Sequence, residues 1–461
     1  MTLFSNIDDD AVVKAKDVYS KIKNIEKSKL NFDKIVSFPK FETFPNISVG
    51  LKAIANGEVG LMILSGGQGS RLGIPHAKGV IDLKLGLSPG KDGTLSYFGK
   101  RIQGLERMCQ RELNLDKLPQ IPVVVMTSSS THEEIEKFFN DHIFKDNILK
   151  KDQVIIEPQL NIPCLDMSGN VIKKSSTEAQ VSPNGNGGFL DCLKKCDDFL
   201  RRKGIKYIHV IAVDNCLSKV CDPSAIGCMV AEGADILNKV VKRRSAFESC
   251  GVMVKIFGDD GSDKAKIIEY SEMPKEVGQS VLENGELKFP YANICSHYFN
   301  VDWLRTLYDV ELPYHEAIKK IPYYDEVKGE LINVDKPNGI KLEKFIFDVF
   351  NYANKVLMIE VPRSEEFSPI KNADSVGVDC ISSAVEALGE LTKKWMFKNN
   401  LNESYDKWLH NHKIDRFFID PRLTYDGEGP VFKVLGEIFE SGTKGPEELT
   451  YEFLCSKIFI N

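Results

Sequence analysis

Short apolar runs that alternate with helix-like segments constrain the fold of this chain more than any other feature. The runs cover residues 61–64, 121–126, 154–156 and 207–213, and segments with helical spacing, such as 97–111 and 132–140, lie between them. An apolar run without polar alternation is typical of a strand that is buried on both faces of a parallel sheet. Strands that alternate with helices therefore predict an α/β fold. Such sheets bind ligands beyond the carboxyl ends of their strands, so the residues after each run are candidates for a site.

The length of the chain predicts more than one domain. A single hydrophobic core stops growing at about 250–300 residues, and this chain has 461. We expect an N-terminal helical segment over residues 1–52, a central α/β domain over 53–378 and a small C-terminal domain over 379–461.

Three local patterns add detail to this division. Residues 9–30 have apolar side chains at helical spacing among many lysines, which predicts a surface helix outside the main core. The pattern over 250–300 predicts hairpins and short strands. After about residue 380 the pattern is helical as far as Lys398, and the aromatic-rich remainder predicts irregular structure.

The charge balance argues against a nucleic-acid-binding protein. The chain has 60 Lys and Arg against 66 Asp and Glu, a net charge of −6, whereas binding to nucleic acid normally needs a basic surface. The start of the chain lacks a secretory signal pattern, and no stretch approaches the ~20 apolar residues of a membrane span. The 11 cysteines include no CxxC spacing and are typical of reduced core thiols. We therefore expect a cytoplasmic protein that binds neither nucleic acid nor membrane.

The strongest candidate for chemistry is the glycine-rich segment LSGGQGSRLG at residues 64–73, with Lys78 shortly after it. Glycines let the backbone approach a ligand and point several N–H groups at one anion. Arg71 and Lys78 add the full charges that a triphosphate needs, and a helix after the loop would add its positive end. The spacing matches neither a P-loop nor a dinucleotide-binding loop. The alternative is an ordinary glycine-rich turn with two solvated cations.

Two further segments follow or lie between the apolar runs. Asp214 comes directly after the run 207–213, where a carboxylate can bind Mg²⁺. A helix cap or a turn is the alternative role for this aspartate. The segment SPNGNGG at 182–188 is too rich in glycine for a strand or a helix. It is either a loop whose backbone contacts a base or ribose, or an ordinary surface loop.

The remaining candidates carry little information individually. They are Glu269 to Glu272, Asn293 with His297, Lys336 to Lys341, and Phe367 to Asp374. His297 is expected to be a structural histidine, and a lysine such as Lys341 would ordinarily be a solvated charge.

Taken together in order, these segments resemble the eukaryotic UDP-N-acetylglucosamine pyrophosphorylase family. The resemblance runs from about residue 60 to 375 and rests on LSGGQGSRLG…K, PNGNGG, YIHVIAVDN, GAD, EYSE, NI..HYF, KPNGIKLEKFIFD and EEFSPIKNADS. It implies a Rossmann-like nucleotidyltransferase (GT-A-like) central domain with a mixed, mainly parallel sheet and smaller N-terminal and C-terminal domains. The terminal segments outside this range are less distinctive.

The resemblance also implies a role for individual residues. Phosphates would be held by Gly66, Gly67 and the catalytic residues Arg71, Lys78 and Lys371, with Lys371 reaching them from the opposite side. Mg²⁺, which Mn²⁺ can replace, would bind Asp214. Uracil would contact Gln159 and Gly187, and the N-acetylhexosamine would contact Gly251, Glu269 and Asn293. The other substrate-binding residues would be Asn186, Asn215 and Lys341.

The implied reaction joins UTP to N-acetylglucosamine 1-phosphate and releases pyrophosphate. Its nucleophile is an already ionised phosphate oxygen, so positioning and electrostatic stabilisation must supply most of the rate. One alternative is a UDP-glucose or broad-specificity UDP-sugar pyrophosphorylase, and the other is a non-catalytic protein that binds nucleotide sugars. Nothing in the sequence demands an oligomer, and we expect a monomer.

One residue departs from the family pattern. The family usually has proline immediately before the lysine that matches Lys78, whereas this chain has Ala77 there and proline at Pro75. The spacing from Arg71 to Lys78 is kept, so the lysine should still reach the site, within a loop that we expect to be less rigid. Ser65 and Ser70 stand where other small residues are usual, with little expected effect.

Overall fold

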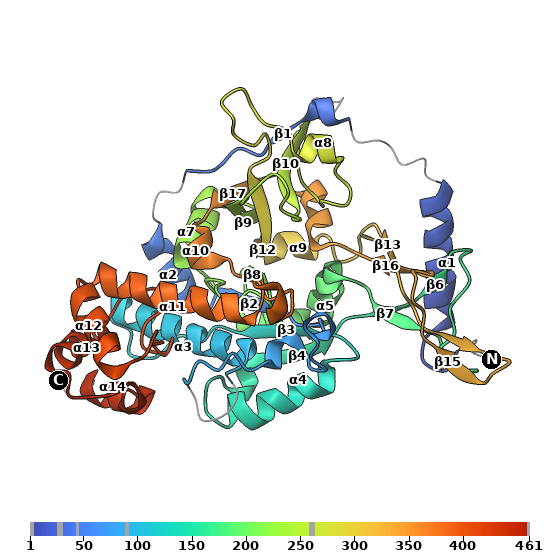
Figure 1. Cartoon of the computed structure of the whole chain (residues 1–461). Coiled ribbons are helices and arrows are strands. Elements are labelled where there is room, and N and C mark those ends of the chain that lie inside the picture. Colours follow the sequence, from blue (N-terminus) through green and yellow to red (C-terminus); the bar gives the residue numbers. More distant parts are fainter. Residues whose placement is uncertain (1–3, 25–30, 43–45, 88–91, 258–262, 459–461) are drawn as a thin grey trace.

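A ten-stranded mixed sheet forms the centre of the protein (Figure 1). The computed structural model describes residues 4–24, 31–42, 46–87, 92–257 and 263–458. The strand order is β1-β10-β12-β8-β2-β3-β4, with β11 beside β10, β9 beside β12 and β17 beside β9. The strands are β1 Ile35–Ser37, β2 Val59–Leu64, β3 Val123–Thr127, β4 Val154–Pro158, β8 Tyr207–Ala212, β9 Ile236–Lys242, β10 Val252–Phe257, β11 Asp263–Ile268, β12 Tyr291–Asn300 and β17 Val356–Glu360.

Most of these strands run in one direction, as the predicted mixed, mainly parallel sheet requires. Strands β4, β3, β2 and β8 are parallel neighbours, and β17 is parallel to β9. Strand β12 lies antiparallel between β8 and β9, and also antiparallel to β10. Strands β1 and β11 are antiparallel to β10. Among the described strands of this sheet, seven therefore point one way and β12, β1 and β11 point the other.

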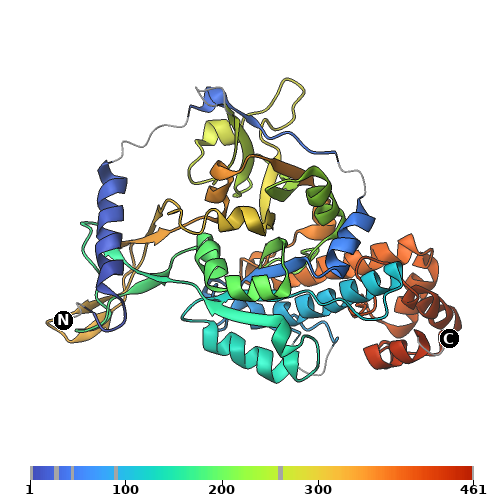
Figure 2. The same cartoon turned by 180° about the vertical axis from the view of Figure 1, so that it is seen from behind.

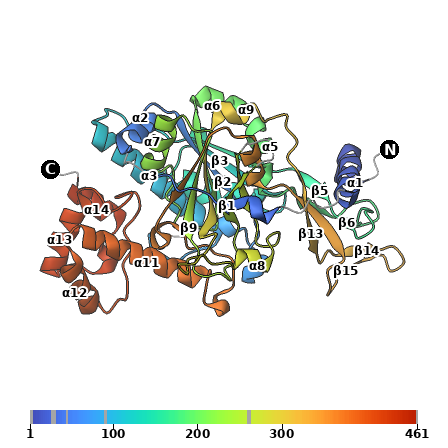
Figure 3. The ribbon, with the colours of Figure 1, turned by 90° about the horizontal axis from the view of Figure 1, so that it is seen from above.

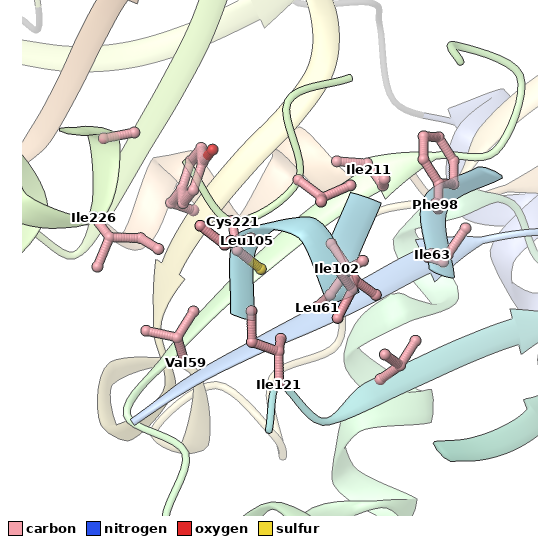
Figure 4. Packing of buried hydrophobic residues seen from close by; sticks show 14 of the residues in the cluster. Val59, Leu61, Ile63, Phe98, Ile102, Leu105, Ile121, Ile211, Cys221 and Ile226 are labelled. Carbon is pink, nitrogen blue, oxygen red and sulfur yellow. The ribbon is translucent and has the colours of Figure 1, made fainter. Parts of the chain in front are cut away.

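The four apolar runs became β2, β3, β4 and β8, which confirms the α/β prediction. Every residue of β2 and β3 is buried, because helices cover both faces of the sheet. On one face Val59, Leu61 and Ile63 pack against helix α3, Thr94–Leu113 (Figure 4). On the other face Met62 and Leu64 pack in a second cluster that includes residues of α5, Phe189–Lys195. The two-residue side-chain period of a strand places successive residues in different clusters.

The N-terminal part of the chain joins the sheet and is not helical throughout. Helix α1, Asp9–Asn24, packs in a separate cluster against the small sheets, outside the main core, as predicted. The last part of the predicted helix, residues 25–30, lies outside the described residues. Strand β1 pairs with β10, and α2, Ile47–Ala55, packs against α7, Pro223–Glu232. The domain boundaries stay predictions.

Short strands form a lateral arm that the sequence patterns did not indicate (Figure 3). Its pairs are β13-β16-β6, β14-β15 and β5-β7, and α1 lies against it. The arm and the C-terminal helices project from opposite sides of the central sheet (Figure 2). The strands of the arm are β5 Asn161–Pro163, β6 Leu165–Asp166, β7 Val181–Pro183, β13 His315–Lys319, β14 Tyr323–Asp325, β15 Glu330–Ile332 and β16 Gly339–Glu343.

The C-terminal part is a helical bundle with its own hydrophobic cluster. Helix α11, Ile381–Lys398, ends where the sequence pattern predicts, but the expectation of irregular structure after it is wrong. Helices α12, α13 and α14 follow, at Asn402–His412, Val431–Ser441 and Tyr451–Ile458. Helix α13 buries Phe432, Leu435 and Phe439, whose spacing of three and four residues is the helical signal.

The hairpin predicted within residues 250–300 is confirmed by β10 and β11, although β12 in the same range is a long central strand. The remaining helices are short. These helices are α4 His132–Phe138, α6 Asp197–Lys203, α8 Lys275–Gly278, α9 Val301–Arg305 and α10 Arg363–Glu366. Of the helices in the described part of the chain, none is long and apolar enough to cross a membrane.

Candidate functional site

A cavity of about 620 Å³ opens beyond the carboxyl ends of β2 and β8. This is the edge of the sheet at which the sequence analysis places a ligand. Ten of the fourteen predicted site residues line the cavity, which brings together segments that are far apart in the sequence. They are Gly66, Gly67, Gln159, Asn186, Asp214, Gly251, Glu269, Asn293, Lys341 and Lys371. Arg71, Lys78, Gly187 and Asn215 do not line it.

The glycine-rich segment leaves β2 and folds back on itself. Gly69 N donates to His76 O at 2.8 Å, and Lys78 N donates to Gly67 O at 3.1 Å. Among the described residues, the amides of Gly66 and Gly67 donate no hydrogen bond, so both are available to an anion in the cavity. Only short 3₁₀ turns, Ser70–Leu72 and Lys78–Val80, follow directly, so no α-helix adds its positive end to the loop.

The two cations of this segment have different surroundings. Lys78 Nζ lies 3.1 Å from Asp214 Oδ2 and 2.9 Å from Ile370 O, and the side chains of Lys78 and Asp214 are only 17% and 20% exposed. Lys78 is therefore held against Asp214, which lines the cavity, and is not a solvated charge. Arg71 lies exposed on the 3₁₀ turn, and the structure does not place it in the cavity.

Asn215 acts as a structural tie. Its side chain donates to Glu366 O at 2.8 Å and to Ser218 Oγ at 3.0 Å, and it accepts from Ser368 N at 2.9 Å. Ile370 N donates to Asp214 O at 2.8 Å. The loop at the end of β8 therefore fixes the segment that carries Lys371, and both N–H groups of the buried Asn215 side chain are used within the protein.

The same segment is anchored to a buried charge. Lys239, fully buried on β9, donates to both carboxylate oxygens of Glu366 and to Asp222 Oδ2 at 2.7 Å. Burial opposes ionisation of Asp222, but the charges of Lys239 and Lys219 and the hydrogen bonds to the carboxylate together outweigh burial and lower the pKa of Asp222. The paired charges hold α10, and with it the start of the Lys371 segment, against the sheet.

At one end of the cavity Gln159 meets the glycine loop. A Cβ atom on Gly66 would lie 2.3 Å from Gln159 Nε2, so a larger residue at position 66 would displace this amide from its present position. Gln159 Oε1 is buried without a described partner and can contact a polar ligand. The acceptor Oδ1 of Asn186 is occupied by Ile346 N at 3.0 Å. The amide of Gly187 donates to Lys344 O at 2.9 Å, so Gly187 serves the packing of two backbone segments.

At the other end Gly251, Glu269 and Asn293 meet. Asn293 N donates to Gly251 O at 2.8 Å, and a Cβ atom on Gly251 would lie 2.7 Å from Glu269 Oε1. Burial and the nearby Glu272 raise the pKa of Glu269, while Lys371 and His315 oppose that rise. The arrangement offers a carboxyl group and amides to the hydroxyl and amide groups of a polar ligand.

Several residues at this end were not predicted. His315 on β13 contacts Glu272 Oε1 at 3.2 Å through Nδ1 and Asp348 Oδ2 at 2.9 Å through Nε2. Burial lowers its basicity, but the two carboxylates outweigh burial and raise the pKa of His315 to about 9. His315 therefore ties the arm to the turn after Glu269. The sequence gives no signal for these contacts, because His315 lies 43 and 33 residues from Glu272 and Asp348.

His315 does not itself line the cavity. The lining residues that were not predicted include Phe347 and Phe367, which lie inside the segments that carry the family resemblance, and Arg244, Glu248 and Asp379, which lie outside them. His297 was expected to be structural, and this is confirmed. It is fully buried, its ring nitrogens have no described partner, and burial lowers its pKa to about 3.

Ala77, which departs from the family pattern, is held by a hydrogen bond. Its amide donates to Glu134 Oε2 at 2.7 Å, and Glu134 Oε1 lies 2.6 Å from His76 Nδ1. A proline has no N–H group and could not make this contact. Glu134 therefore supplies a constraint on the loop just before Lys78 that the sequence did not reveal.

Comparisons with known proteins find similar sequences and a similar fold. The family model described as UTP–glucose-1-phosphate uridylyltransferase matches residues 4–401. The UDP-N-acetylglucosamine pyrophosphorylase of Saccharomyces cerevisiae is 36% identical over 356 residues, 76% of this chain and 72% of the yeast protein. The UDP-N-acetylglucosamine diphosphorylase 2 of Arabidopsis thaliana is 34% identical over 82% of this chain and 74% of its own. The Trypanosoma brucei uridine diphosphate N-acetylglucosamine pyrophosphorylase matches the fold with a TM-score of 0.77 at 24% identity, over 96% of this chain and 89% of its own.

We predict that Glu134→Ala loosens the loop over residues 66–78. A hydrogen bond to a charged group contributes roughly 1.5–3 kcal/mol, so amide exchange in this loop should accelerate about ten- to a hundredfold. Because Ala77 has a φ of −61°, which proline also adopts, adding Ala77→Pro should restore part of the protection. Hydrogen–deuterium exchange of the loop peptide measures both effects. Glu133→Ala, at an exposed neighbouring position, is the control, and equal exchange in both single variants would contradict the role of Glu134.

We predict that His315 makes folding stability depend on pH. Folding raises the pKa of His315 from its ordinary value of 6.5 to about 9, so its contribution is fully present below pH 6.5 and is lost as the pH rises through about 9. The difference in unfolding free energy between wild type and His315→Gln should shrink between pH 6 and pH 10. Urea denaturation across this range measures it, with the exposed His410→Gln as control. A difference that stays constant with pH would exclude a charged His315.

Proposed function

The chain belongs to the UTP–glucose-1-phosphate uridylyltransferase family, and on this premise we propose that it is a UDP-N-acetylglucosamine pyrophosphorylase. The enzyme joins UTP to N-acetylglucosamine 1-phosphate and releases pyrophosphate. Relatives with this activity in their names match at 34–36% identity over three quarters or more of the chain. The observation that carries the proposal is the cavity itself, which places glycine amides and the Lys78–Asp214 pair together with Lys371.

The reaction needs charge control more than acid–base chemistry. A phosphate oxygen of the sugar 1-phosphate attacks the α-phosphorus of UTP, the new P–O bond forms, and the bond from the α-phosphorus to the β-phosphate oxygen breaks. The electron pair of the broken bond leaves with pyrophosphate. Both reactants are anions, so bound cations must hold them in line and stabilise the leaving group. No covalent intermediate is required.

The residues of the cavity support this division of labour. We assign the free amides of Gly66 and Gly67, with Lys78, to the phosphates of UTP, and Lys371 to the phosphates from the opposite side. Arg71 would have to move from its exposed turn to take part. By comparison with removed oxyanion donors, the loss of one such group costs about 10²–10³ in rate. Gln159, whose buried Oε1 is without a described partner, is assigned to the uracil edge.

The donor set at Asp214 fits Mg²⁺ that arrives with a nucleotide. Lys78 occupies one carboxylate oxygen, and no described residue contacts the other. Among the described residues there is no group of three or more His, Cys, Asp or Glu that could hold a metal. One carboxylate plus substrate phosphates is the usual Mg²⁺ arrangement in phosphoryl-transfer sites. Bound there, Mg²⁺ or Mn²⁺ would neutralise charge on the α-phosphate.

The sugar end supports a substrate with an N-acetyl group. Gly251, Glu269 and Asn293 offer a carboxyl group and amides in one wall of the cavity. UDP-glucose synthesis is the second candidate, because the family model is described by glucose 1-phosphate. We also propose a monomer in the cytoplasm. Free thiols on all 11 cysteines support a reducing compartment.

A substrate panel tests the proposed function. With UTP and Mg²⁺, pyrophosphate release should be fastest with N-acetylglucosamine 1-phosphate, compared with N-acetylgalactosamine 1-phosphate and glucose 1-phosphate. A preference for glucose 1-phosphate would assign the chain to UDP-glucose synthesis. Binding of UDP-N-acetylglucosamine without any pyrophosphate release would instead identify a non-catalytic binding protein.

We predict that Asp214→Asn shifts the metal dependence of turnover. Half-saturation by Mg²⁺ should move to a higher concentration, and the maximal rate should fall by about 10²–10³. Lys78→Met also breaks the Lys78–Asp214 pair but keeps the carboxylate, so it should slow turnover without shifting the metal titration. Glu386→Gln, at an exposed position on α11, controls for the loss of one negative charge. Identical titrations for wild type and Asp214→Asn would remove Asp214 from the metal site.

A further inference from the structure

Arg244 is a cation in the cavity wall to which the sequence analysis gave no role. It lies two residues after the end of β9 and lines the cavity with Glu248 and Gly251 of the same loop. Gly251 belongs to the end of the cavity assigned to the sugar. Arg244 is therefore on the side from which a sugar 1-phosphate, and not the uridine, would approach.

The backbone of Arg244 is firmly fixed. Its amide donates to Glu248 Oε2 at 2.6 Å, and Glu248 is itself held by the Nη2 atom of Arg363 at 2.8 Å and 3.0 Å. The neighbouring Arg243 has a different use, because its guanidinium donates to the carbonyl oxygens of Gly278, Phe289 and Ala246. Of these two adjacent arginines, Arg243 holds the loop together and Arg244 projects from it.

The guanidinium of Arg244 is only loosely held. Its one described partner is Asp379, with Nη1 3.3 Å from Oδ1, and the two side chains are 45% and 29% exposed. An exposed ion pair of this kind contributes little free energy and is easily exchanged. A fixed backbone with a loosely paired guanidinium is the arrangement expected of a side chain that changes partner when a ligand arrives.

Asp379 places this pair next to Lys371. Its carbonyl oxygen accepts from Lys371 N at 2.7 Å and from Asn372 N at 2.9 Å. Its φ of +49° is a left-handed conformation that few residues other than glycine and asparagine adopt readily. Asp379 therefore contacts the backbone of Lys371 through its carbonyl oxygen and the side chain of Arg244 through its carboxylate, and all three residues line the cavity.

We propose that Arg244 is a further substrate-binding residue. Its guanidinium gives up its contact with Asp379 and binds the phosphate group of the incoming sugar 1-phosphate. This inference rests on the proposed function. A phosphate carries more negative charge than a carboxylate and can accept two parallel hydrogen bonds from a guanidinium. It therefore competes well against a single 3.3 Å contact. In the ligand-free enzyme Asp379 keeps Arg244 at the cavity edge and compensates its charge.

The two partners of the pair give the test, because substrate binding and structural bracing predict different results. Arg244→Gln should raise the KM for N-acetylglucosamine 1-phosphate about ten- to a hundredfold, with little change in the KM for UTP. Arg244→Lys should recover part of the loss. Asp379→Asn frees Arg244 and keeps a residue that tolerates positive φ, so this KM should stay the same or fall. Lys242→Gln, the loss of an exposed cation outside the cavity, is the control.

Each outcome of this experiment decides the matter. Equal increases in KM for Arg244→Gln and Asp379→Asn would mean that the pair is only a brace, and an unchanged KM in Arg244→Gln would remove Arg244 from the site. A rise confined to the KM for UTP would also overturn the inference. If the wild-type enzyme releases no pyrophosphate from UTP and any sugar 1-phosphate, the proposed function fails. If the variants are active and their KM values are unaltered, only the role of Arg244 fails.

Discussion

The contact between Lys78 and Asp214 is the interaction on which the rest of the site depends. It joins the loop after β2 to the loop after β8, and the same ammonium group binds the carbonyl oxygen of Ile370. Asp214 and Ile370, which lie 136 and 292 residues from Lys78 in the sequence, thus meet at its one nitrogen atom. Parallel strands β2 and β8 make this possible, because their carboxyl ends lie side by side. Without that register the glycine loop and the carboxylate would face different surfaces.

The buried charges behind this contact explain why the far wall of the cavity is well positioned. An ion pair buried at Lys239 is a poor source of stability, because desolvation offsets much of the attraction. It is a strong source of geometry, because Lys239 is the only cation within ion-pair distance of Glu366 among the described residues. Asn215 adds hydrogen bonds to the same segment, so the chain enters the cavity at Pro369 with little freedom. Lys371 then projects from a backbone that its own amide ties to Asp379.

Hydrophobic periodicity predicted most of the fold, and the positions of strand ends predicted many of the site residues. The features that were not predicted depend on tertiary contacts. The runs that became β2, β3, β4 and β8 were recognisable because burial on both faces removes polar alternation. The C-terminal helices were missed although Phe432, Leu435 and Phe439 of α13 have helical spacing. The family resemblance implied that Asn215 contacts substrate, whereas the fold shows its side chain bonded to Glu366 and Ser368. No local pattern could reveal that Glu134 accepts a hydrogen bond from the amide of Ala77, 57 residues away in the sequence.

A common electrostatic principle unites the parts of the cavity. Cations gathered for polyanionic substrates would repel one another in the ligand-free enzyme, and the protein relieves this by giving them carboxylates nearby. Lys78 is paired with Asp214, and Arg244 with Asp379, while Lys371 lies close enough to Glu269 to oppose the rise in its pKa. Because the Arg244 pair is partly exposed and long, it separates at little cost, whereas the Lys78 pair is more buried and also braced by a carbonyl oxygen. The cavity therefore combines a fixed cation at the nucleotide loop with an exchangeable one at the sugar end, which suits a reaction in which two anions must be held close together.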